Sequence, residues 1–487
     1  MPQAGRIVSR AGWRFGRVSI PDWRAGLSRV QAVEFDVVTF LTVWLALLYL
    51  LSARQIFGPL GAVGSPAMIA GMGAALVWVC TWLLPHTGLY HERHPMRPML
   101  LVWCWYAVVS YAIAMTRPLT ELELTGADRG LVTVLAMVGI ALLAADGIGT
   151  IDGTTKLLRR LTYLGAAMAV IGIGEFLYGT RLEVLMPGLT WDKPAAVASR
   201  FGFNRPRATA LHPIEFSVVM GALLPLAIHF ALYDRTRRRR RIGAAIVVLI
   251  AVAIPMSVSR SGVVALAVGL FVLAVGWGPR RWANAAAAAV AGAIVLWWAL
   301  PGLMNTVVGL FTATQDSHSI QSRIERVPRI MELVRERPWF GLGNGTWSVE
   351  DYFLIDNEIW VTTLEMGIIG LTLTAVLLIT GAVVALCIRS LPGADEATGH
   401  LGRAVAASIA ALGVSLITFD AFHYRILTGT LFLLLGVAGA LWRLTSHKMA
   451  SPLFPRWTPP ARSSSAEGEA TAHPDEQPLE ATLREDG

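Results

Sequence analysis

The sequence predicts an all-α integral membrane protein that crosses a bilayer about twelve times. Of its 487 residues, 54% are apolar and 15% are charged, whereas soluble domains average about 45–50% and about 25%. The apolar residues gather in long runs, and about 20 such residues are enough for a helix to span a bilayer. This composition excludes a soluble fold. The segments between the runs are too short for a large soluble enzyme domain.

Twelve apolar stretches define a membrane domain over residues 34–449. A basic segment precedes it at 1–33, and the tail at 450–487 is rich in Pro, Ser, Ala and Glu, which predicts disorder. The first stretch is too long for the core of a signal peptide, so we expect it to remain as a span. The stretches cover residues 34–53, 67–85, 98–115, 130–147, 161–178, 213–233, 242–258, 261–278, 283–301, 362–388, 404–420 and 426–442.

Basic residues recur in every second loop, which the positive-inside rule assigns to the cytoplasm. Both termini are then cytoplasmic. The run Arg237–Arg241 joins two spans, so we interpret it as a topology anchor and expect no nucleic-acid partner. The external segments would be 54–66, 116–129, 179–212, 302–361 and 421–425. The cytoplasmic basic residues would be Arg93, Arg97, Lys156, Arg159, Arg160, Arg235, Arg237–Arg241, Arg280, Arg281, Arg389, Arg403, Arg443 and Lys448.

The two long external loops are also basic, which the charge rule permits because it acts mainly on short loops. A guanidinium group matches two oxygens of a phosphate. Two such loops could therefore hold a phosphate-bearing ligand at the outer leaflet, and solvated loop arginines are the alternative. The residues are Arg181, Lys193, Arg200, Arg205 and Arg207 in the first loop, and Arg323, Arg326, Arg329, Arg335 and Arg337 in the second.

The second long loop predicts an amphipathic helix. Ser322 and Glu325 have the spacing of a capping box, which marks a helix start, and apolar residues recur beyond them at helical spacing. Arg323 and Arg326 fall along one flank of the apolar stripe, which would set them at head-group depth on a bilayer surface. We expect Pro328 to kink or limit this helix.

Arg260 stands in a Ser-Arg-Ser-Gly turn between two apolar stretches, on the predicted external side. An arginine at such a boundary is costly unless it is paired or reaches the head groups, so it is a candidate functional residue. Anchoring at the interface is the alternative. Gly262 would permit close approach of the backbone to a ligand.

Four further residues are candidates for proton transfer or support. Asp356 and Glu358 precede the tenth stretch, where a base role and simple pairing with an arginine are both open. His212 and Glu215 open the sixth stretch and are rival candidates, although a histidine at a helix start often only caps or packs. The glycine-rich run at 341–345 lacks a following Lys-Ser or Lys-Thr, which excludes a nucleotide-binding loop.

Four pieces of sequence occur in a fixed order. They are Arg207-Ala-Thr-Ala-Leu-His212-Pro-Ile-Glu-Phe216, the Ser-Arg260-Ser-Gly turn, Arg323 with Glu336-Arg-Pro-Trp-Phe-Gly-Leu-Gly343, and Asp356-Asn357 with Glu365-Met-Gly-Ile-Ile-Gly370. Together they resemble the O-antigen ligase and O-antigen polymerase superfamily of bacterial polytopic membrane proteins. Each piece is weak alone, whereas the ordered set is fairly specific. The resemblance covers about 200–390, which would be the ligase-like core.

The resemblance implies a fold of about twelve helices, of the GT-C-like type of polyprenyl-phosphate-dependent glycosyltransferases, with a cavity on the periplasmic side. It also implies transfer of a glycan from an undecaprenyl-pyrophosphate carrier to an acceptor hydroxyl. The family needs no nucleotide sugar and no obligatory metal, so we expect no cofactor.

The resemblance also implies roles for individual residues. Arginines that match Arg260 and Arg323 would contact the pyrophosphate, and Arg207 and Arg326 are further candidates. Ligases commonly have His-Asn where this chain has Asp356 followed by Asn, and there the His is the proposed base. This departure leaves the base assignment open. The candidate catalytic residues are Asp356 and His212, and the candidate acceptor or supporting residues are Glu215, Asn357 and Glu358.

These observations predict a metal-independent inverting glycosyltransferase in the bacterial cytoplasmic membrane, acting outside as an O-antigen ligase or polysaccharide polymerase. Its partners would be an undecaprenyl-pyrophosphate-linked glycan, a glycan or glycolipid acceptor, and the bilayer. The alternative is a transporter or lipid-linked-glycan binding protein without catalysis. Ionisable residues gather in the external loops and are few at the midplane of the first five stretches, which favours interfacial chemistry over transport.

Overall fold

The computed structural model describes residues 36–58, 63–83, 89, 92–180, 190–191, 197–312 and 317–446. At 190–191 and 317–324 it describes the backbone alone. The predicted basic segment at 1–33 and the predicted disordered tail at 450–487 lie outside the described residues.

The described chain is mainly helical. Its helices are α2 (Val37–Leu50), α3 (Pro66–Leu83), α4 (Met96–Ala114), α5 (Glu121–Gly147), α6 (Ile151–Tyr178), α7 (Pro213–Tyr233), α8 (Arg237–Met256), α9 (Arg260–Ala274), α10 (Pro279–Ala299), α11 (Leu303–Thr312), α12 (Ser317–Glu336), α13 (Glu358–Cys387), α14 (Glu396–Ser415) and α15 (Arg425–Ser446). The short elements are β1 (Gln55–Ile56), β2 (Thr190–Trp191), β3 (Ala198–Arg200), β4 (Phe203–Arg205), η3 (Ile388–Ser390) and η4 (Ala421–His423).

Eight of the described helices are long and apolar enough to cross a membrane, by length and composition. This agrees with the predicted polytopic membrane protein. Each of the twelve predicted stretches overlaps one helix, but α2 and α9 are shorter, with 14 and 15 residues. The number of twelve crossings therefore stays a prediction.

Three helices begin well before the predicted stretches, and one of them, α14, begins at Glu396 rather than near 404. α5 begins at Glu121 rather than near 130, and α6 begins at Ile151 rather than near 161. Thr120 caps α5 in a capping box with Glu123, and the Thr150 hydroxyl caps α6. Hydropathy marks only the apolar part of a helix, whereas these capped first turns are polar.

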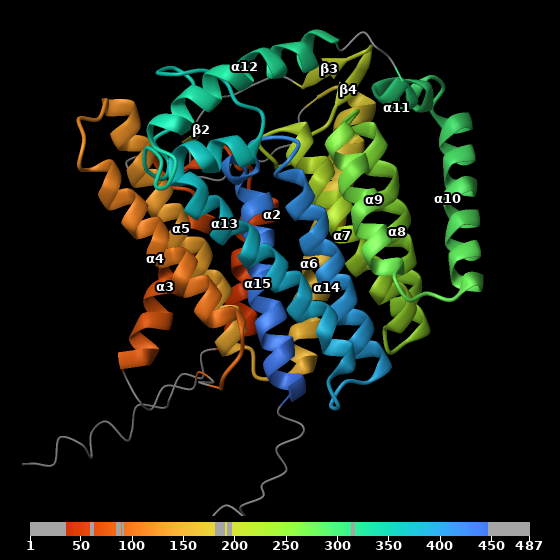
Figure 1. The fold of residues 1–487 in the computed structure, drawn as a ribbon. Coiled ribbons are helices and arrows are strands. Elements are labelled where there is room, and N and C mark those ends of the chain that lie inside the picture. Colours follow the sequence, from red (N-terminus) through yellow and green to blue (C-terminus); the bar gives the residue numbers. More distant parts are fainter. Residues whose placement is uncertain are drawn as a thin grey trace, which may run out of the picture. The chain divides into compact units, whose positions relative to one another are not determined.

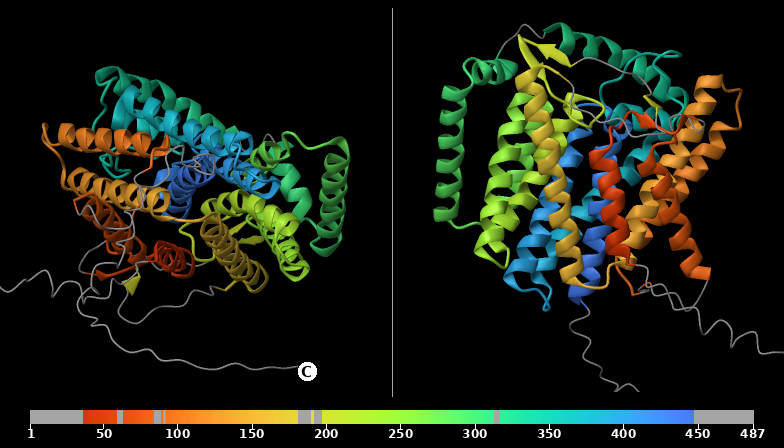
Figure 2. Two further views of the ribbon diagram at one scale, coloured as in Figure 1. Left: turned by 90° about the horizontal axis from the view of Figure 1, so that it is seen from below. Right: turned by 180° about the vertical axis from the view of Figure 1, so that it is seen from behind.

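The long helices run side by side between two ends (Figures 1 and 2). We call the end with α12 and the short strands the upper end, as drawn in Figure 1, and the other the lower end. α15 is the most buried of the candidate spans and packs against α5, α13 and α14. α10 has no buried residue and stands at the edge of the group, joined to α11 (Figure 1).

Two antiparallel strand pairs lie at the upper end, and neither was predicted. Gln55 of β1 pairs with Trp191 of β2, and Ala198 of β3 pairs with Arg205 of β4. Strands of two or three residues are too short for an alternating pattern to be recognised in sequence. The pair β1–β2 joins the first long loop to the segment after α2, whereas β3 and β4 form a hairpin within that loop.

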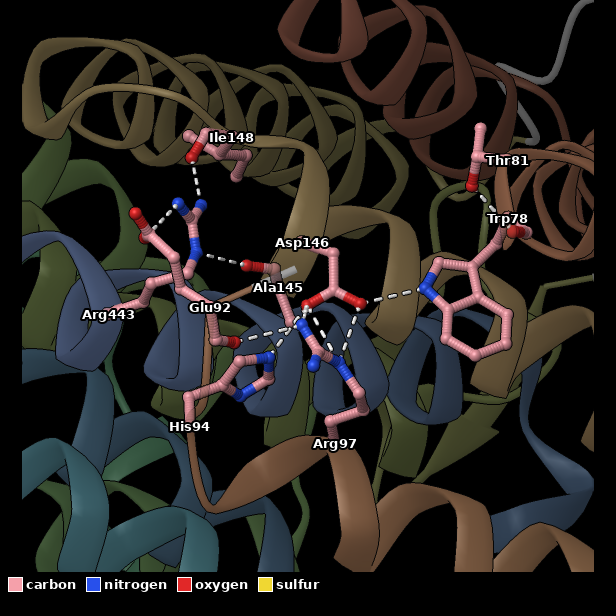
Figure 3. A network of polar contacts seen from close by, with 9 residues as sticks. All are labelled: Trp78, Thr81, Glu92, His94, Arg97, Ala145, Asp146, Ile148 and Arg443. Atoms are coloured by element: carbon pink, nitrogen blue, oxygen red, sulfur yellow. Dashed lines mark hydrogen bonds and ion pairs between the residues drawn. The ribbon is translucent and has the colours of Figure 1, made fainter. Parts of the chain in front are cut away.

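Asp146 joins the lower ends of α3, α4 and α5, and it is 2% exposed. Its carboxylate accepts a hydrogen bond from Trp78 Nε1 at 2.8 Å, and His94 Nε2 lies 2.7 Å from it. Arg97 donates to both carboxylate oxygens, at 2.6 and 3.0 Å. Figure 3 shows these side chains approaching Asp146 from different sides. The buried charge is therefore paired and hydrogen-bonded, which is the condition under which burial is tolerated.

Arg443 of α15 extends this network (Figure 3). It is 1% exposed, donates from Nε to the carbonyl of Ala145 at 3.2 Å and from Nη2 to the carbonyl of Ile148, and pairs with Glu92 at 3.4 Å. A cation at the carboxyl end of α5 satisfies carbonyls that the helix leaves free. Arg97 and Arg443, which the sequence assigned to the cytoplasmic side from their charge, are thus also packing residues.

Replacing Asp146 by Ala removes a buried carboxylate and leaves Arg97, whose side chain is 12% exposed, without this partner. We expect the protein to lose about 3–5 kcal/mol of unfolding free energy, the usual cost of breaking a buried pair. Thermal unfolding of the detergent-solubilised protein measures this loss. The control is Glu332→Ala, which removes an exposed ion pair with Arg329 and should change stability by less than about 1 kcal/mol. Equal effects of the two substitutions would contradict the prediction.

Candidate active site

α13 is interrupted near its upper end. Gly367 has φ 68° and ψ −175°, outside the helical region. A Cβ at this position would lie 2.1 Å from the carbonyl oxygen of Trp339, so only glycine fits. Just beyond the break, the N–H of Ile368 donates to the carbonyl of Pro338 at 2.8 Å. A loop of the same chain therefore fills the break.

The same loop also satisfies the carbonyls before the break. Leu342 N donates to the carbonyl of Leu364 at 2.8 Å, and Gly343 N donates to the carbonyl of Glu365 at 2.7 Å. Gly341 and Gly343 have φ of 70° and 122°, which glycine adopts without strain. The glycine-rich run is thus a turn seated in the helix break, and two of the four sequence pieces meet there.

α12 packs on α13 and lies across the upper end (Figure 1). The prediction of its limits is wrong, because it begins at Ser317 instead of Ser322 and continues through Pro328. Ile320 continues the apolar period upstream of Ser322, but the residues at 317–319 are polar, so the capping-box pattern at Ser322 placed the helix start too late. Ile330 is buried and packs with Ile355, so protein, and not lipid, covers the apolar stripe at this point.

α12 carries two of the predicted phosphate-binding arginines. Arg326 donates from Nη1 to the carbonyl of Leu354 at 2.8 Å, in the segment that leads to Asp356. The backbone of Arg323 lies on the same helix, but its side chain lies outside the described residues. The convergence of Arg323 with Arg260 therefore stays a prediction.

His212 is the N-cap of α7, and its Nδ1 accepts the N–H of Ile214 at 3.1 Å. A neutral imidazole that accepts at Nδ1 carries its proton on Nε2. Burial, together with the charges of Arg205 and Arg54, lowers the pKa of His212 to about 4, although Asp356 opposes this. At neutral pH the ring is uncharged, caps the helix, and presents an N–H donor in place of a base.

Asp356 and Asp420 lie close enough to interact electrostatically. Burial and the negative charge of Asp356 raise the pKa of Asp420 to about 7. His212 is close enough to interact with Asp356 electrostatically, and its ring centroid lies 6.3 Å from that of Tyr424. Residues from three separate loops thus meet at the upper end. A carboxyl group with a pKa near neutrality is suited to exchanging a proton.

The first residues of α13 hold this carboxylate pair together. Glu358 N donates to the carbonyl of Phe419 at 3.1 Å, and the buried Glu358 carboxylate accepts the N–H of Phe422 at 3.0 Å. Asn357 donates from Nδ2 to the carbonyl of Ile417 at 3.1 Å. These bonds fasten the start of α13 to the turn between α14 and α15.

Glu215 fastens α7 to α15 in a similar way. Its fully buried carboxylate accepts the N–H groups of Ile426 at 2.8 Å, Leu427 at 3.3 Å and Leu211 at 2.8 Å. Both oxygens are engaged with backbone. This geometry favours the supporting role over the role of a base.

Glu175, at the upper end of α6, holds the segment that carries Arg207. Its buried carboxylate accepts the N–H of Arg207 at 3.0 Å and that of Ala208 at 2.8 Å. Ala208 has φ 49°, a conformation that costs energy for a non-glycine residue and persists only where the surroundings enforce it. Arg207 itself is 7% exposed.

Arg260 is the first residue of α9 and follows a strained turn. Val258 has φ 49°, which is rare for a β-branched residue and is typical of functional or tightly constrained sites. Arg205 donates from Nε to the carbonyl of Ser257 at 3.0 Å. The turn before Arg260 therefore lies against the segment that leads to His212.

The close packing of α9 against α7 explains why a glycine stands at position 262, where the sequence suggested the approach of a ligand. A Cβ at this position would lie 2.4 Å from Cβ of Ser217 on α7. Small residues at such a contact let two helices approach closely. The beginning of α9 is thereby brought next to the beginning of α7.

Sequence reasoning missed Arg54, Asp420 and Tyr424. Arg54 falls in a predicted external turn that gave no further signal. Asp420 and Tyr424 belong to the run Phe-Asp-Ala-Phe-His-Tyr-Arg between two helices. The acidic residue among aromatic residues in so short a turn is the sequence feature by which Asp420 and Tyr424 could have been recognised.

Residues 245–375 match the family model of O-antigen ligase. The chain carries an O-antigen ligase domain. The resemblance to the O-antigen ligase and polymerase superfamily is thereby confirmed. No curated protein matches the chain in sequence.

The O-antigen ligase domain begins within α8 and ends within α13. It contains Arg260, α12, the glycine-rich turn and Asp356, whereas His212 and Asp420 lie outside it, in the loop before α7 and in the turn after α14. Together with the apolar helices, the domain indicates glycan transfer of the O-antigen ligase or polymerase kind at a bacterial inner membrane. Among the described residues, no group of three or more His, Cys, Asp or Glu side chains is placed to hold a metal ion.

Replacing Glu215 by Ala removes the acceptor of three backbone N–H groups. Since each unsatisfied buried group costs about 1–3 kcal/mol, we expect a loss of roughly 3 kcal/mol or more of stability. Hydrogen exchange at Ile426 and Leu427 should accelerate. Glu215→Gln keeps one oxygen and should fall between wild type and Ala. The control is Glu121→Ala on the exposed first turn of α5. Unchanged exchange at Leu427 would refute the clamping role.

Proposed function

We propose that the protein transfers a glycan from an undecaprenyl-pyrophosphate carrier to an acceptor hydroxyl, as an O-antigen ligase or a polysaccharide polymerase. The observation that carries this proposal is the meeting of the Asp356–Asp420 pair, His212 and the Arg205–Ser257 contact beside the O-antigen ligase domain. In this proposal the fold is GT-C-like with twelve crossings. The upper end faces outside, and the arginine-rich lower end faces the cytoplasm.

The chemistry sets two requirements. The acceptor oxygen forms a bond to C1 of the donor sugar while the bond from C1 to the pyrophosphate oxygen breaks, and the pyrophosphate leaves with the electron pair. The hydroxyl proton passes to a base. Fixed positive charge must stabilise the leaving group, and a positioned base must face the hydroxyl. A single displacement of this kind inverts C1 and needs no metal.

Arginines supply the positive charge. We propose that Arg260 and Arg205 contact the pyrophosphate, with Arg207, Arg323 and Arg326 lining the approach. Burial and the neighbouring Arg200 lower the pKa of Arg205 to about 10, so it remains positively charged at neutral pH.

The carboxylate pair supplies the base. Asp356 accepts the hydroxyl proton, and Asp420 is a second carboxyl group near it, whose pKa is raised by burial and by the charge of Asp356. The Nε2 proton of His212 serves as a hydrogen-bond donor to the pair or to the leaving group. Glu215, Asn357 and Glu358 hold these groups in place.

The break in α13 supports catalysis over transport. Discontinuous helices in transporters offer their freed backbone groups to substrates and ions. Here the freed groups at Leu364, Glu365 and Ile368 are bound by the chain's own loop, so the break offers no ligand set for passage.

Purified protein in vesicles, supplied with a labelled polyprenyl-pyrophosphate-linked glycan and candidate acceptors, tests the proposal. We expect labelled glycan on the acceptor together with release of polyprenyl pyrophosphate. Flux of the intact lipid-linked glycan without bond cleavage would refute the enzymatic proposal in favour of transport.

Arg260→Ala should lower kcat about 10²- to 10³-fold, as removal of one preorganised donor does elsewhere. Arg260→Lys should recover only part, because an ammonium lacks the two-pronged geometry. Arg335→Ala, an exposed arginine on α12, is the control and should retain activity. Normal kcat in Arg260→Ala, with protein in the membrane, would remove the pyrophosphate role.

The transfer rate should rise with pH through about 7 and then level off, because the carboxylate pair must be ionised to accept a proton and Asp420 has a pKa of about 7. Asp420→Asn should abolish this rise by removing the titrating partner of Asp356. The control is Asp351→Asn, an exposed carboxylate on the same side. A pH profile unchanged in Asp420→Asn would exclude the pair as the base.

A further inference from the structure

A cavity of about 450 Å³ opens at the lower end, between the start of α6 and the turn from α7 to α8. It lies at the opposite end of the helices from the candidate active site, and glycan transfer uses none of its residues. The lining residues are Asp152, Lys156, Arg159, Arg160, Tyr163, Arg235 and Arg239.

The lining is strongly cationic because basic residues of α6 and of the segment that begins α8 surround the same cavity. Lys156, Arg159 and Arg160 recur at a spacing of three and four on α6, which places them on one helix face. Arg235 and Arg239 approach from the other side, four residues apart. The first turn of α8 contains no acidic residue.

Acidic residues neutralise only part of this charge. Asp152 pairs with Lys156 at 2.7 Å and with Arg235 at 3.1 Å, and Asp234 binds Arg159 at 2.9 Å. The five lining cations outnumber these two carboxylates by three. Within the part of the chain that the structure describes, no ion pair involves either of the two remaining arginines of the lining, at 160 and 239.

Exposed apolar side chains lie on the helices beside the cavity, where the acyl chains of a lipid could contact them. Tyr163, which lines it, is 39% exposed, and farther along the same helix Val170 is 57% exposed. Val248, on α8, is 63% exposed. Acyl chains can therefore lie along α6 and α8 while the charged group of the same lipid occupies the cavity.

We propose that this cavity binds the head group of an anionic phospholipid, with its phosphodiester oxygens on Arg160 and Arg239. Guanidinium groups bind such oxygens with paired hydrogen bonds, and basic pockets between membrane helices are suited to anionic head groups. The bound lipid would come from the inner leaflet. This assignment to a leaflet rests on the orientation given in the proposed function. Binding itself does not require glycan transfer.

Native mass spectrometry of the detergent-solubilised full chain, titrated with phosphatidylglycerol or phosphatidylcholine, tests the site. Wild type should bind phosphatidylglycerol saturably and phosphatidylcholine poorly. The double variant R160Q/R239Q should bind phosphatidylglycerol roughly tenfold or more weakly, since two basic contacts are lost. The matched control R238Q/R241Q removes two exposed arginines of the same run that do not line the cavity, and should bind as wild type does.

Three outcomes would overturn the proposal. An equal loss of binding in the control would mean diffuse attraction by the arginine run. Displacement of the lipid by millimolar inorganic phosphate or glycerol 3-phosphate would mean a soluble-phosphate site. Undiminished binding in R160Q/R239Q, with an unchanged unfolding temperature, would place the lipid elsewhere. Since no donor glycan is present, these results are independent of the transfer assay.

Discussion

The upper end of the structure depends on buried carboxylates that bind backbone N–H groups of neighbouring loops. Glu175 holds the Arg207 segment, Glu215 holds the start of α15, and Glu358 holds the turn after α14. A carboxylate can remain in such a place only where hydrogen bonds replace water, and a loop can remain there only where its N–H groups are satisfied. Each carboxylate and its loop therefore require one another, and the proposed catalytic residues stand on the loops so held.

The lower end uses carboxylates differently. Asp146 and Asp234 bind guanidinium groups, through Arg97 and Arg159, because arginines are plentiful on that side. At the upper end, Glu175, Glu215 and Glu358 bind backbone N–H groups instead. This difference suits the proposed binding of a pyrophosphate leaving group at the upper end and of lipid head groups at the lower end.

Site residues could be predicted from the sequence where their role depends on neighbouring residues, and were missed where it depends on residues distant in the sequence. The Arg260 turn and the glycine-rich run were recognisable because their residue types are unusual between apolar stretches. The capping role of His212 was one of two alternatives, and only the Ile214 N–H decides it. Asp420 was missed because its significance comes from Asp356, which is distant in sequence. The sequence suggested that Gly262 would permit close approach of a ligand, and the structure shows that it also permits the close contact of α9 with α7.

The sequence by itself determined that the chain is a helical membrane protein with basic loops in a regular alternation, since hydropathy and charge act over a single segment. It also carried the ordered motifs of the O-antigen ligase family. Only the tertiary structure decided that α13 is broken to admit the Pro338 loop, that α12 packs on α13, and that Asp356 and Asp420, from different loops, lie close enough to interact. Those features depend on backbone hydrogen bonds and charge proximity between distant segments, which no local pattern encodes.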